Sequence, residues 1–498
     1  MPTISTRRIG PALVFERLWS ETGCQHVIEQ LREGRRFECD VERAIFLTVL
    51  HRLFAPGSDR AADKWKADYR IEGVDALQLH HHYRTMAWLG EELPHDQQAG
   101  QTPFTPRCTK DRIEEGLFAH RRDLFSGLPL VFCDTTSIYF EGNGGQDIGQ
   151  RGYSKDHRPD LYQMIVGAVL DAQGRPICCE LWPGNTTDVT TLIPVVDRLR
   201  SRFGIRRVCI VADRGMISRE TIEALEQDQR GWLYILGARM RSQTEVKDEV
   251  LARAGRYRVV HSPRVKSDDP APLKVKEVWV EDRRYVVCLN EDEARKDAAD
   301  REAIVAALRE QLRRGDKALV GNKGYRRYLS GGGPEHFRID EAKVAEDARY
   351  DGKWVLRTNT ELDSAEVALQ YKQLWMVEQW FRSCKSLLQT RPIYHRCDET
   401  IRGHVFCSFL ALVLRQELQA RLEERGEEFE WADVISDLDR LQVVEVEQDG
   451  KRFLLRSEVQ GSCGAVFQAT GVALPPTVQQ ASPNHPGGDA AHSATPPG

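Results

Sequence analysis

The sequence predicts an α/β protein with a mixed β-sheet core, a helical region before it and an inserted α+β subdomain within it. Short apolar runs typical of buried strands alternate with amphipathic helical segments from residue 127 onward. This alternation is interrupted over residues 238–351. A chain of 498 residues is long enough for two to four folding units.

The first region, residues 1–126, carries helical signals and little strand character. Asp40 precedes a periodic apolar stripe that stops at Pro56, and residues 76–93 and 109–125 repeat this pattern. The run His80-His81-His82 lies within the second of these helices. Because consecutive helical residues point about 100° apart, we do not expect these histidines to converge on a metal ion.

The first part of the core, residues 127–237, follows as three strands, a helix, a strand, a helix and a strand. A turn of Asp171-Ala-Gln-Gly174 joins the second and third strands as a hairpin. The elements are expected at residues 128–134, 162–170, 176–182, 188–203, 206–213, 218–228 and 232–236. This order predicts a mixed sheet with helices on its faces.

The rest of the chain divides by pattern into four parts. The insertion, residues 238–351, contains a hairpin and a helix after Asn290 with an acidic first turn and a basic last turn, which suits the helix dipole. The second part of the core, 352–420, holds a strand and a long helix at about 364–388. Residues 421–470 hold an acidic stretch and a hairpin, and the Pro/Gly/Ala-rich residues 471–498 predict a disordered tail.

Composition excludes several classes of protein. The most apolar run, Val405–Leu414, has ten residues where a membrane-spanning helix needs about 20, so it predicts a buried helix. The N-terminus shows no secretory signal, which favours a cytoplasmic protein. Twelve dispersed cysteines predict reduced core residues.

The net charge of −5 does not exclude a nucleic-acid partner. Residues 421–450 hold 3 basic and 11 acidic residues, a net −8, so the remainder of the chain sums to +3. Binding a nucleic acid requires only a local basic surface, whatever the overall sign of the charge.

Two aspartates each follow a buried strand. Asp134 ends the first core strand and Asp213 ends the fourth. If the strands are neighbours, the carboxylates converge, and their repulsion requires a cation such as Mg²⁺ or Mn²⁺ between them. The alternative is that each aspartate only caps the loop that follows it.

A third carboxylate, Glu378, lies on the long helix. One face of that helix is formed by residues at alternating intervals of four and three: Val367, Tyr371, Leu374, Glu378, Phe381, Lys385 and Leu388. A glutamate within an apolar face needs a partner, and Lys385 lies about 10 Å along the axis, too far for a direct ion pair. Glu378 is therefore predicted as a metal ligand and Lys385 as a contact to an anionic substrate. The alternative is a glutamate at the edge of the stripe that reaches solvent.

Basic residues cluster after Glu378. They are Arg382, Lys385, Arg391, Arg396 and Arg402, against the acidic Asp398 and Glu399. Such a cluster is suited to phosphate contacts, although a solvated helix face would give the same pattern. Lys155, His157 and Arg158 form a second basic cluster without an assigned role. For Trp375 and Trp380, core packing is more economical than stacking on an unpaired base.

The residues around Glu378 resemble a known signature. The sequence is similar to bacterial insertion-sequence transposases of the DDE class, which have a ribonuclease-H-like catalytic core and a Y-x2-R-x3-E-x6-K motif. Here the motif is Tyr371, Leu374, Glu378 and Lys385, with leucine in place of arginine, and Arg382 is a candidate for the missing charge. The phrases DTTSIYFEG, GYSKDHRPDLYQ, PGNTTD, VADRGM and RPIYHR…IRGHVF also resemble this family, over residues 10–420.

This resemblance implies a function and a set of site residues. Asp134, Asp213 and Glu378 would hold two Mg²⁺ ions, with Mn²⁺ as a substitute. Water would cut DNA at the ends of the element, and the freed 3′-OH would attack target DNA. Tyr371, Arg382, Lys385 and Arg391 would contact DNA.

The resemblance also implies partners. Residues 1–126 would bind the terminal inverted repeats, and a homodimer would hold two ends in a synaptic complex at the bacterial nucleoid, in the cytoplasm. Two alternatives stay open: a metal-dependent nuclease of the same fold, and a non-catalytic DNA-binding protein derived from a transposase.

Overall fold

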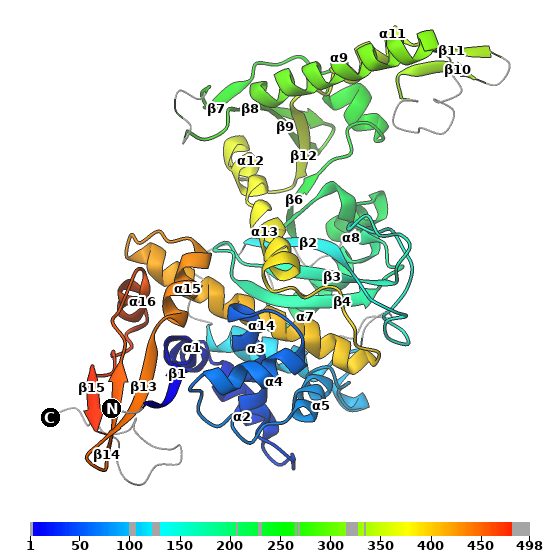
Figure 1. Ribbon diagram of the computed structural model, residues 1–498. Helices are drawn as coiled ribbons and strands as arrows, with labels where there is room; N and C mark the ends of the chain where they lie inside the picture. The colour runs from blue at the N-terminus through cyan, green and yellow to red at the C-terminus, as the bar shows by residue number, and fades with distance from the viewer. Residues whose placement is uncertain are drawn as a thin grey trace. The chain divides into compact units, whose positions relative to one another are not determined.

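The computed structural model divides into two compact units. The first comprises Met1–Arg206 with Trp375–Gly498, and the second comprises Arg207–Leu374. Most elements of both units are labelled in Figure 1. The structure describes residues 3–98, 106–121, 130–205, 208–227, 232–263, 266, 269–314, 327–332 and 335–480.

The N-terminal part of the first unit is helical, as predicted. Its α-helices are α1 (Gly10–Glu21), α2 (Cys24–Arg32), α3 (Val41–Phe54), α4 (Asp59–Trp65), α5 (Leu79–Leu89) and α6 (Thr109–His120). Asp40 caps α3 by accepting a hydrogen bond from the Arg43 amide at 3.4 Å. Helix α14 (Asp398–Glu424) packs against α3 and α5, and its residues 405–414 are buried. The apolar run is therefore a core helix, as expected.

Three antiparallel strands of the first unit carry the predicted core. Their order is β4-β3-β2, with β2 at Leu130–Tyr139, β3 at Gln163–Leu170 and β4 at Pro176–Pro183. The turn between β3 and β4 ends at Gly174, whose φ of +74° favours glycine. Helix α7 (Leu192–Phe203) follows, and α13 (Trp375–Arg382) packs against β2 and β3.

A small sheet joins the two ends of the described chain. Its order is β1-β13-β14-β15, with bounds Thr3–Arg8, Gln442–Gln448, Lys451–Arg456 and Val478–Gln480. Helices α15 (Trp431–Asp439) and α16 (Cys463–Thr470) accompany it. The β13–β14 hairpin was predicted, whereas β1 and β15 were not. The prediction of disorder from residue 471 is therefore wrong for β15, which pairs with β14, and residues 481–498 lie outside the described chain.

Six of the described strands of the second unit form one run of a sheet, in the order β5-β6-β12-β9-β8-β7. Their bounds are Cys209–Ala212, Leu233–Gly237, Lys353–Thr358, Arg283–Leu289, Leu273–Val280 and Arg258–His261. Strands β5 and β6 are parallel, and the other pairs are antiparallel. The hairpin predicted within the insertion, β8–β9, continues this sheet through β12.

Helices and a hairpin complete the second unit. They are α8 (Arg219–Gln227), a π-helical turn at Glu245–Val250, α9 (Glu291–Arg314), the β10–β11 hairpin (Leu329–Gly332 and Glu335–Ile339), α11 (Glu341–Ala348) and α12 (Ser364–Lys372). The order of strands and helices agrees with the ribonuclease-H-like α/β class expected from the sequence.

The long helix predicted over residues 364–388 is broken. It consists of α12, α13 and a π-helical segment, Ser383–Leu387, called η8. At the break, the amides of Gln373 and Leu374 bond to carbonyls three residues back, which tightens the last turn of α12. The single continuous stripe expected from the spacing is therefore interrupted between Tyr371 and Glu378.

Two further predictions concern the core. All twelve cysteines are unpaired, and ten of them are buried, as expected for reduced core residues. Among the helices in the described part of the chain, none combines the length and apolarity that a membrane crossing requires.

A buried ionic network joins α6 to β4 and α7. Its members are Lys110, Asp111, Glu114, Glu180, Arg198 and Arg202. The Arg202 side chain is fully buried and donates to Glu114 at 2.6 Å and to Glu180 at 3.2 Å. Burial alone would raise the pKa of Asp111. The positive charges of Lys110 and Arg202 outweigh this effect, so the pKa of Asp111 lies below its ordinary value. Ion pairs between buried side chains therefore hold the helical region against the sheet, and each charge is compensated by its partners.

We expect Arg202→Met to lower the free energy of unfolding by about 3–5 kcal/mol, because two buried carboxylates lose a shared cation. Arg200→Met, at an exposed position of the same helix, is the control and should change it by less than about 0.5 kcal/mol. Chemical unfolding followed by tryptophan fluorescence measures both. Equal losses of unfolding free energy in the two variants would show that disruption of the ionic network does not cause the loss.

Candidate active site

Asp134 lies within β2 and is half-buried. Its Oδ1 accepts a hydrogen bond from the Thr135 amide at 2.7 Å, which orients the carboxylate. The strand was predicted to end at Asp134 but continues to Tyr139, because the polar residues after Asp134 pair with β3. Asp134 therefore projects from the body of a strand rather than from its end.

Asp213 directly follows β5 in the second unit, as predicted, and is half-buried. Its Oδ1 accepts a hydrogen bond from the Tyr371 hydroxyl at 2.8 Å. Tyr371 lies on α12, which packs against β5 and β6. Gly237 makes this contact possible, since a Cβ at that position would overlap the Tyr371 hydroxyl. The need for this glycine was not visible in the sequence.

Glu378 lies on α13 in the first unit and is exposed. The prediction that it lies inside a buried stripe is wrong, because the buried side chains of α13 are those of Val377, Trp380 and Phe381. Leu374 and Phe381 are buried as expected. Within the described chain, Glu378 has no hydrogen-bond or ion-pair partner, so its carboxylate is available to a ligand.

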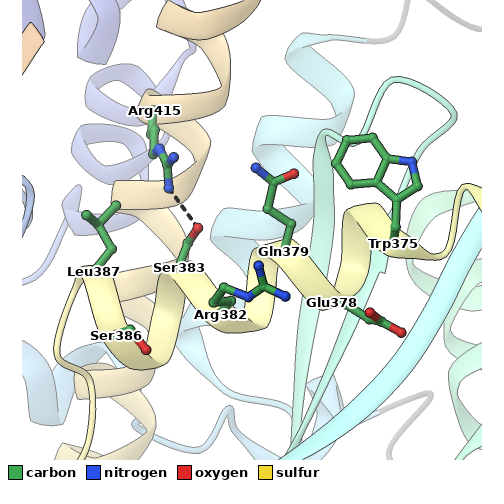
Figure 2. A pocket seen from close by; sticks show the side chains of 8 residues that line it. All are labelled: Trp375, Glu378, Gln379, Arg382, Ser383, Ser386, Leu387 and Arg415. Carbon is green, nitrogen blue, oxygen red and sulfur yellow. Dashed lines mark hydrogen bonds between the residues drawn. The ribbon is translucent and has the colours of Figure 1, made fainter. Parts of the chain in front are cut away.

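A groove of about 700 Å³ lies beside Glu378 along α13 (Figure 2). It is lined by Trp375, Glu378, Gln379, Arg382, Ser383, Ser386, Leu387 and Arg415. Arg415 Nη1 donates to Ser383 Oγ at 2.7 Å. Two guanidinium groups, two hydroxyls and an amide make this groove rich in hydrogen-bond donors, which suits an anionic ligand.

The two tryptophans of α13 differ. Trp380 is 6% exposed and packs in the core, as expected. Trp375 is 53% exposed and lines the groove, so the expectation of core packing is wrong for this residue. Figure 2 shows the Trp375 ring and the Glu378 carboxylate pointing to different sides of α13.

Lys385 and Arg391 converge on one carboxylate that the sequence analysis did not single out. Asp156 Oδ1 accepts from Lys385 Nζ at 2.7 Å and lies 2.8 Å from Arg391 Nη1. The Asp156 side chain is only 5% exposed. Burial lowers the pKa of Lys385, while Asp156 opposes this shift. The two cations and one carboxylate carry a net charge of +1.

Arg396 and Arg402, the remaining arginines of the basic cluster after Glu378, differ in burial. Arg396 is exposed, whereas Arg402 is buried and bonds to the Gly90 carbonyl at 3.3 Å. Arg402 therefore has a structural role and is not part of a phosphate-binding surface. Burial also lowers the pKa of His404 well below its ordinary value, so its ring is neutral.

The donor sets of the chain bear on metal binding. The side chains of Asp134, Asp213 and Glu378 each offer oxygen atoms, the ligands that Mg²⁺ and Mn²⁺ prefer. In addition, Glu38, His80 and His81 hold ligand atoms within 4.8 Å of one another. The expectation that these histidines diverge is wrong for His80 and His81, whose ring centroids lie 4.0 Å apart.

The groups around Glu38 are already engaged. Its carboxylate pairs with Arg84, and the His81 Nδ1 accepts the amide of Gln78 at 3.0 Å. His82 contacts Thr48 instead, with 3.0 Å between its Nδ1 and the hydroxyl. These contacts leave the Glu38 group with few free ligand atoms for a cation.

A protein-family model matches more than half of the chain. The model of the transposase DDE domain matches residues 126–414. A search of solved structures gives a cryo-EM structure of the piggyBac transposase synaptic complex with hairpin DNA, with a TM-score of 0.40 and 11% identity over 86% of this chain and 79% of that chain. Among curated proteins no relative matches.

We expect Tyr371→Phe to lower the free energy of unfolding by about 1 kcal/mol, because Asp213 loses a hydrogen-bond donor. Gly237→Ala should cost at least as much, since its Cβ displaces the same hydroxyl. Tyr394→Phe, at a side chain that is 71% exposed, is the control. Equal losses for the two tyrosine variants in thermal unfolding would contradict the contact.

Proposed function

The chain belongs to the family of transposases with a DDE domain and is therefore an enzyme of DNA transposition, and we propose that it cleaves the ends of an insertion sequence and joins each freed 3′-OH to target DNA. The observation that carries this proposal is the family match over residues 126–414, a span that contains Asp134, Asp213 and Glu378.

We propose that these three carboxylates bind the divalent metal ions that the family uses. Support comes from their chemistry: all are oxygen donors, and hydrogen bonds from Thr135 and Tyr371 orient the two aspartates. Glu378 is exposed, and within the described residues its carboxylate has no hydrogen-bond or ion-pair partner. Two Mg²⁺ or Mn²⁺ ions bound there would activate the attacking oxygen and stabilise the leaving 3′ oxygen.

The chain's own groups then bind and orient DNA. We propose that Arg382, Lys385 and Arg391 contact phosphates around the scissile bond. Arg382 is exposed in the groove beside Glu378 and is suited to the role of the arginine that Leu374 replaces. Tyr371 stays in the proposed set of DNA contacts, with its hydroxyl also orienting Asp213. Trp375 offers an exposed ring for stacking on an unpaired base.

We also propose that different parts of the chain have different roles in transposition. Residues 1–126 would bind the terminal inverted repeats, and residues 127–237 with 352–420 would form the catalytic core around the insertion at 238–351. Residues 421–470 and 471–498 lie outside this catalytic arrangement. Two DNA ends would require a homodimer in the synaptic complex.

We expect Asp134→Ala, Asp213→Ala and Glu378→Ala each to abolish Mg²⁺-dependent cleavage of a duplex that carries an element end, because each removes a metal ligand. DNA affinity in a gel-shift assay should stay within about threefold of the wild type, since the phosphate contacts remain. Glu424→Ala, at an exposed position on α14, should retain full cleavage.

The same assay separates the alternatives. Full cleavage by any of the three carboxylate variants would contradict the assignment. Cleavage by the wild type without joining of the 3′-OH to new DNA would favour a nuclease. Binding of terminal repeats without any cleavage would favour a non-catalytic DNA-binding protein.

We expect Lys385→Ala to weaken DNA binding and to reduce the slope of log affinity against log salt by about 1, because one phosphate contact is lost. Lys451→Ala, at an exposed position at the start of β14, is the matched control and should leave the slope unchanged. Titrations at several salt concentrations measure both. A wild-type slope for Lys385→Ala would remove this residue from the phosphate contacts.

A further inference from the structure

We propose that Lys155 and Asp156 form a clamp that positions Asp134 against Glu378. Both carboxylates belong to the first unit, Asp134 on β2 and Glu378 on α13. The inference rests on the proposed function in one respect, the role of these carboxylates. Lys155 and Asp156 are neighbours in sequence and of opposite charge, and their side chains bind different parts of the unit.

Lys155 binds the strand that carries Asp134. Its Nζ donates to the Thr135 carbonyl at 2.7 Å and to the Thr135 hydroxyl at 2.9 Å, and pairs with Asp188 at 2.9 Å. The Thr135 hydroxyl in turn donates to Asp188 at 2.6 Å. Because the Thr135 amide also holds Asp134 Oδ1, Lys155 fixes the residue that orients this carboxylate.

Asp156 binds the helical segment that carries Glu378. Its Oδ1 takes Lys385 Nζ at 2.7 Å, and Lys385 lies in η8, which directly continues α13. Arg391 joins the same oxygen at 2.8 Å, and its guanidinium also lies over the ring of Tyr139, the last residue of β2, at 5.5 Å. Asp156 thus ties the Glu378 segment back to the strand of Asp134.

The turn that presents the two side chains is itself fixed. Ser154 Oγ accepts from the amides of Asp156 at 3.3 Å and Arg158 at 3.1 Å, and His157 has a φ of +57°. The Lys155 amide donates to Ser137 Oγ on β2 at 2.8 Å. The clamp is therefore anchored by its backbone as well as by its charges.

The charges of the clamp are paired and largely buried. Asp156 and Lys385 have side chains only 5% and 11% exposed. Removing one member leaves a partner without compensation, so the local structure shifts to solvate it. Displacement of a catalytic group by about 1 Å costs about 100-fold in rate. Lys155 and Asp156 act through other residues, and we therefore class them as positioning residues.

The test uses the full chain and a duplex carrying an element end. Lys155→Met and Asp156→Asn should lower the cleavage rate at saturating DNA by about 10- to 100-fold, with DNA affinity within about threefold of the wild type. The Mg²⁺ concentration for half-maximal cleavage should rise in both, because the carboxylates are less well placed. Lys155→Arg keeps a hydrogen-bond donor for the Thr135 carbonyl and a cation for Asp188, and it should recover part of the rate lost in Lys155→Met.

A second readout requires no activity. Hydrogen exchange of the DNA-free protein should increase over Ser383–Leu387 in Asp156→Asn and around Thr135 in Lys155→Met. Arg158→Met is the control, because Arg158 pairs with the exposed Asp160, and it should change neither segment. Asp156→Asn keeps the shape of the side chain, and its thermal unfolding shows whether the variant is folded.

The outcomes separate the clamp from the proposed function. Wild-type protein that cleaves no element end contradicts the proposed function, and the exchange data still decide whether the clamp exists. Active wild type with unchanged rates in both variants overturns the positioning role, whatever the exchange data show. Unchanged exchange in both segments overturns the clamp itself.

Discussion

The account depends on one electrostatic constraint: carboxylates that share a small volume repel each other unless a cation or hydrogen-bond donors compensate them. In this chain each aspartate of the proposed site has a donor that orients it, the Thr135 amide for Asp134 and the Tyr371 hydroxyl for Asp213. Glu378 is the exception, since it is exposed and unpaired within the described chain. Two oriented carboxylates and one exposed carboxylate, all with oxygen donors, fit the proposed role of binding a hard divalent ion.

The same constraint governs the cations. A basic side chain close to a proposed DNA site is expected to face the phosphate, yet Lys385 and Arg391 share the buried carboxylate of Asp156. Arg202 likewise satisfies Glu114 and Glu180 at the contact between helices and sheet. Buried charges of both kinds are held in networks, so their geometry is set before any ligand arrives. Such preorganisation is what a phosphoryl-transfer site requires.

Much of this could be predicted from the sequence, where a local pattern decides the structure. The hairpin at Asp171–Gly174, the strand before Asp213 and the buried helix around residues 405–414 follow from turn chemistry and apolar runs. The predictions failed where contacts between residues distant in sequence determine the local structure. Glu378 is exposed although the spacing predicted it on an apolar face, and β1 pairs with β13, where Ser5 lies opposite Glu445, 440 residues away. Asp156 and Gly237 could not have been found from periodicity, because their roles depend on side chains distant in sequence.

The central claim is that Asp134, Asp213 and Glu378 bind the same metal ions, and replacement of Mg²⁺ by Fe²⁺ tests it most directly. With added hydrogen peroxide and ascorbate, the bound Fe²⁺ reduces peroxide to hydroxide and a hydroxyl radical, and ascorbate regenerates Fe²⁺. The radicals cut the nearby polypeptide backbone, and the fragments locate the bound metal. The account predicts cuts close to residues 134, 213 and 378 that excess Mg²⁺ suppresses together. Cuts that omit one of these segments, or that fall only around Glu38, His80 and His81, would contradict it.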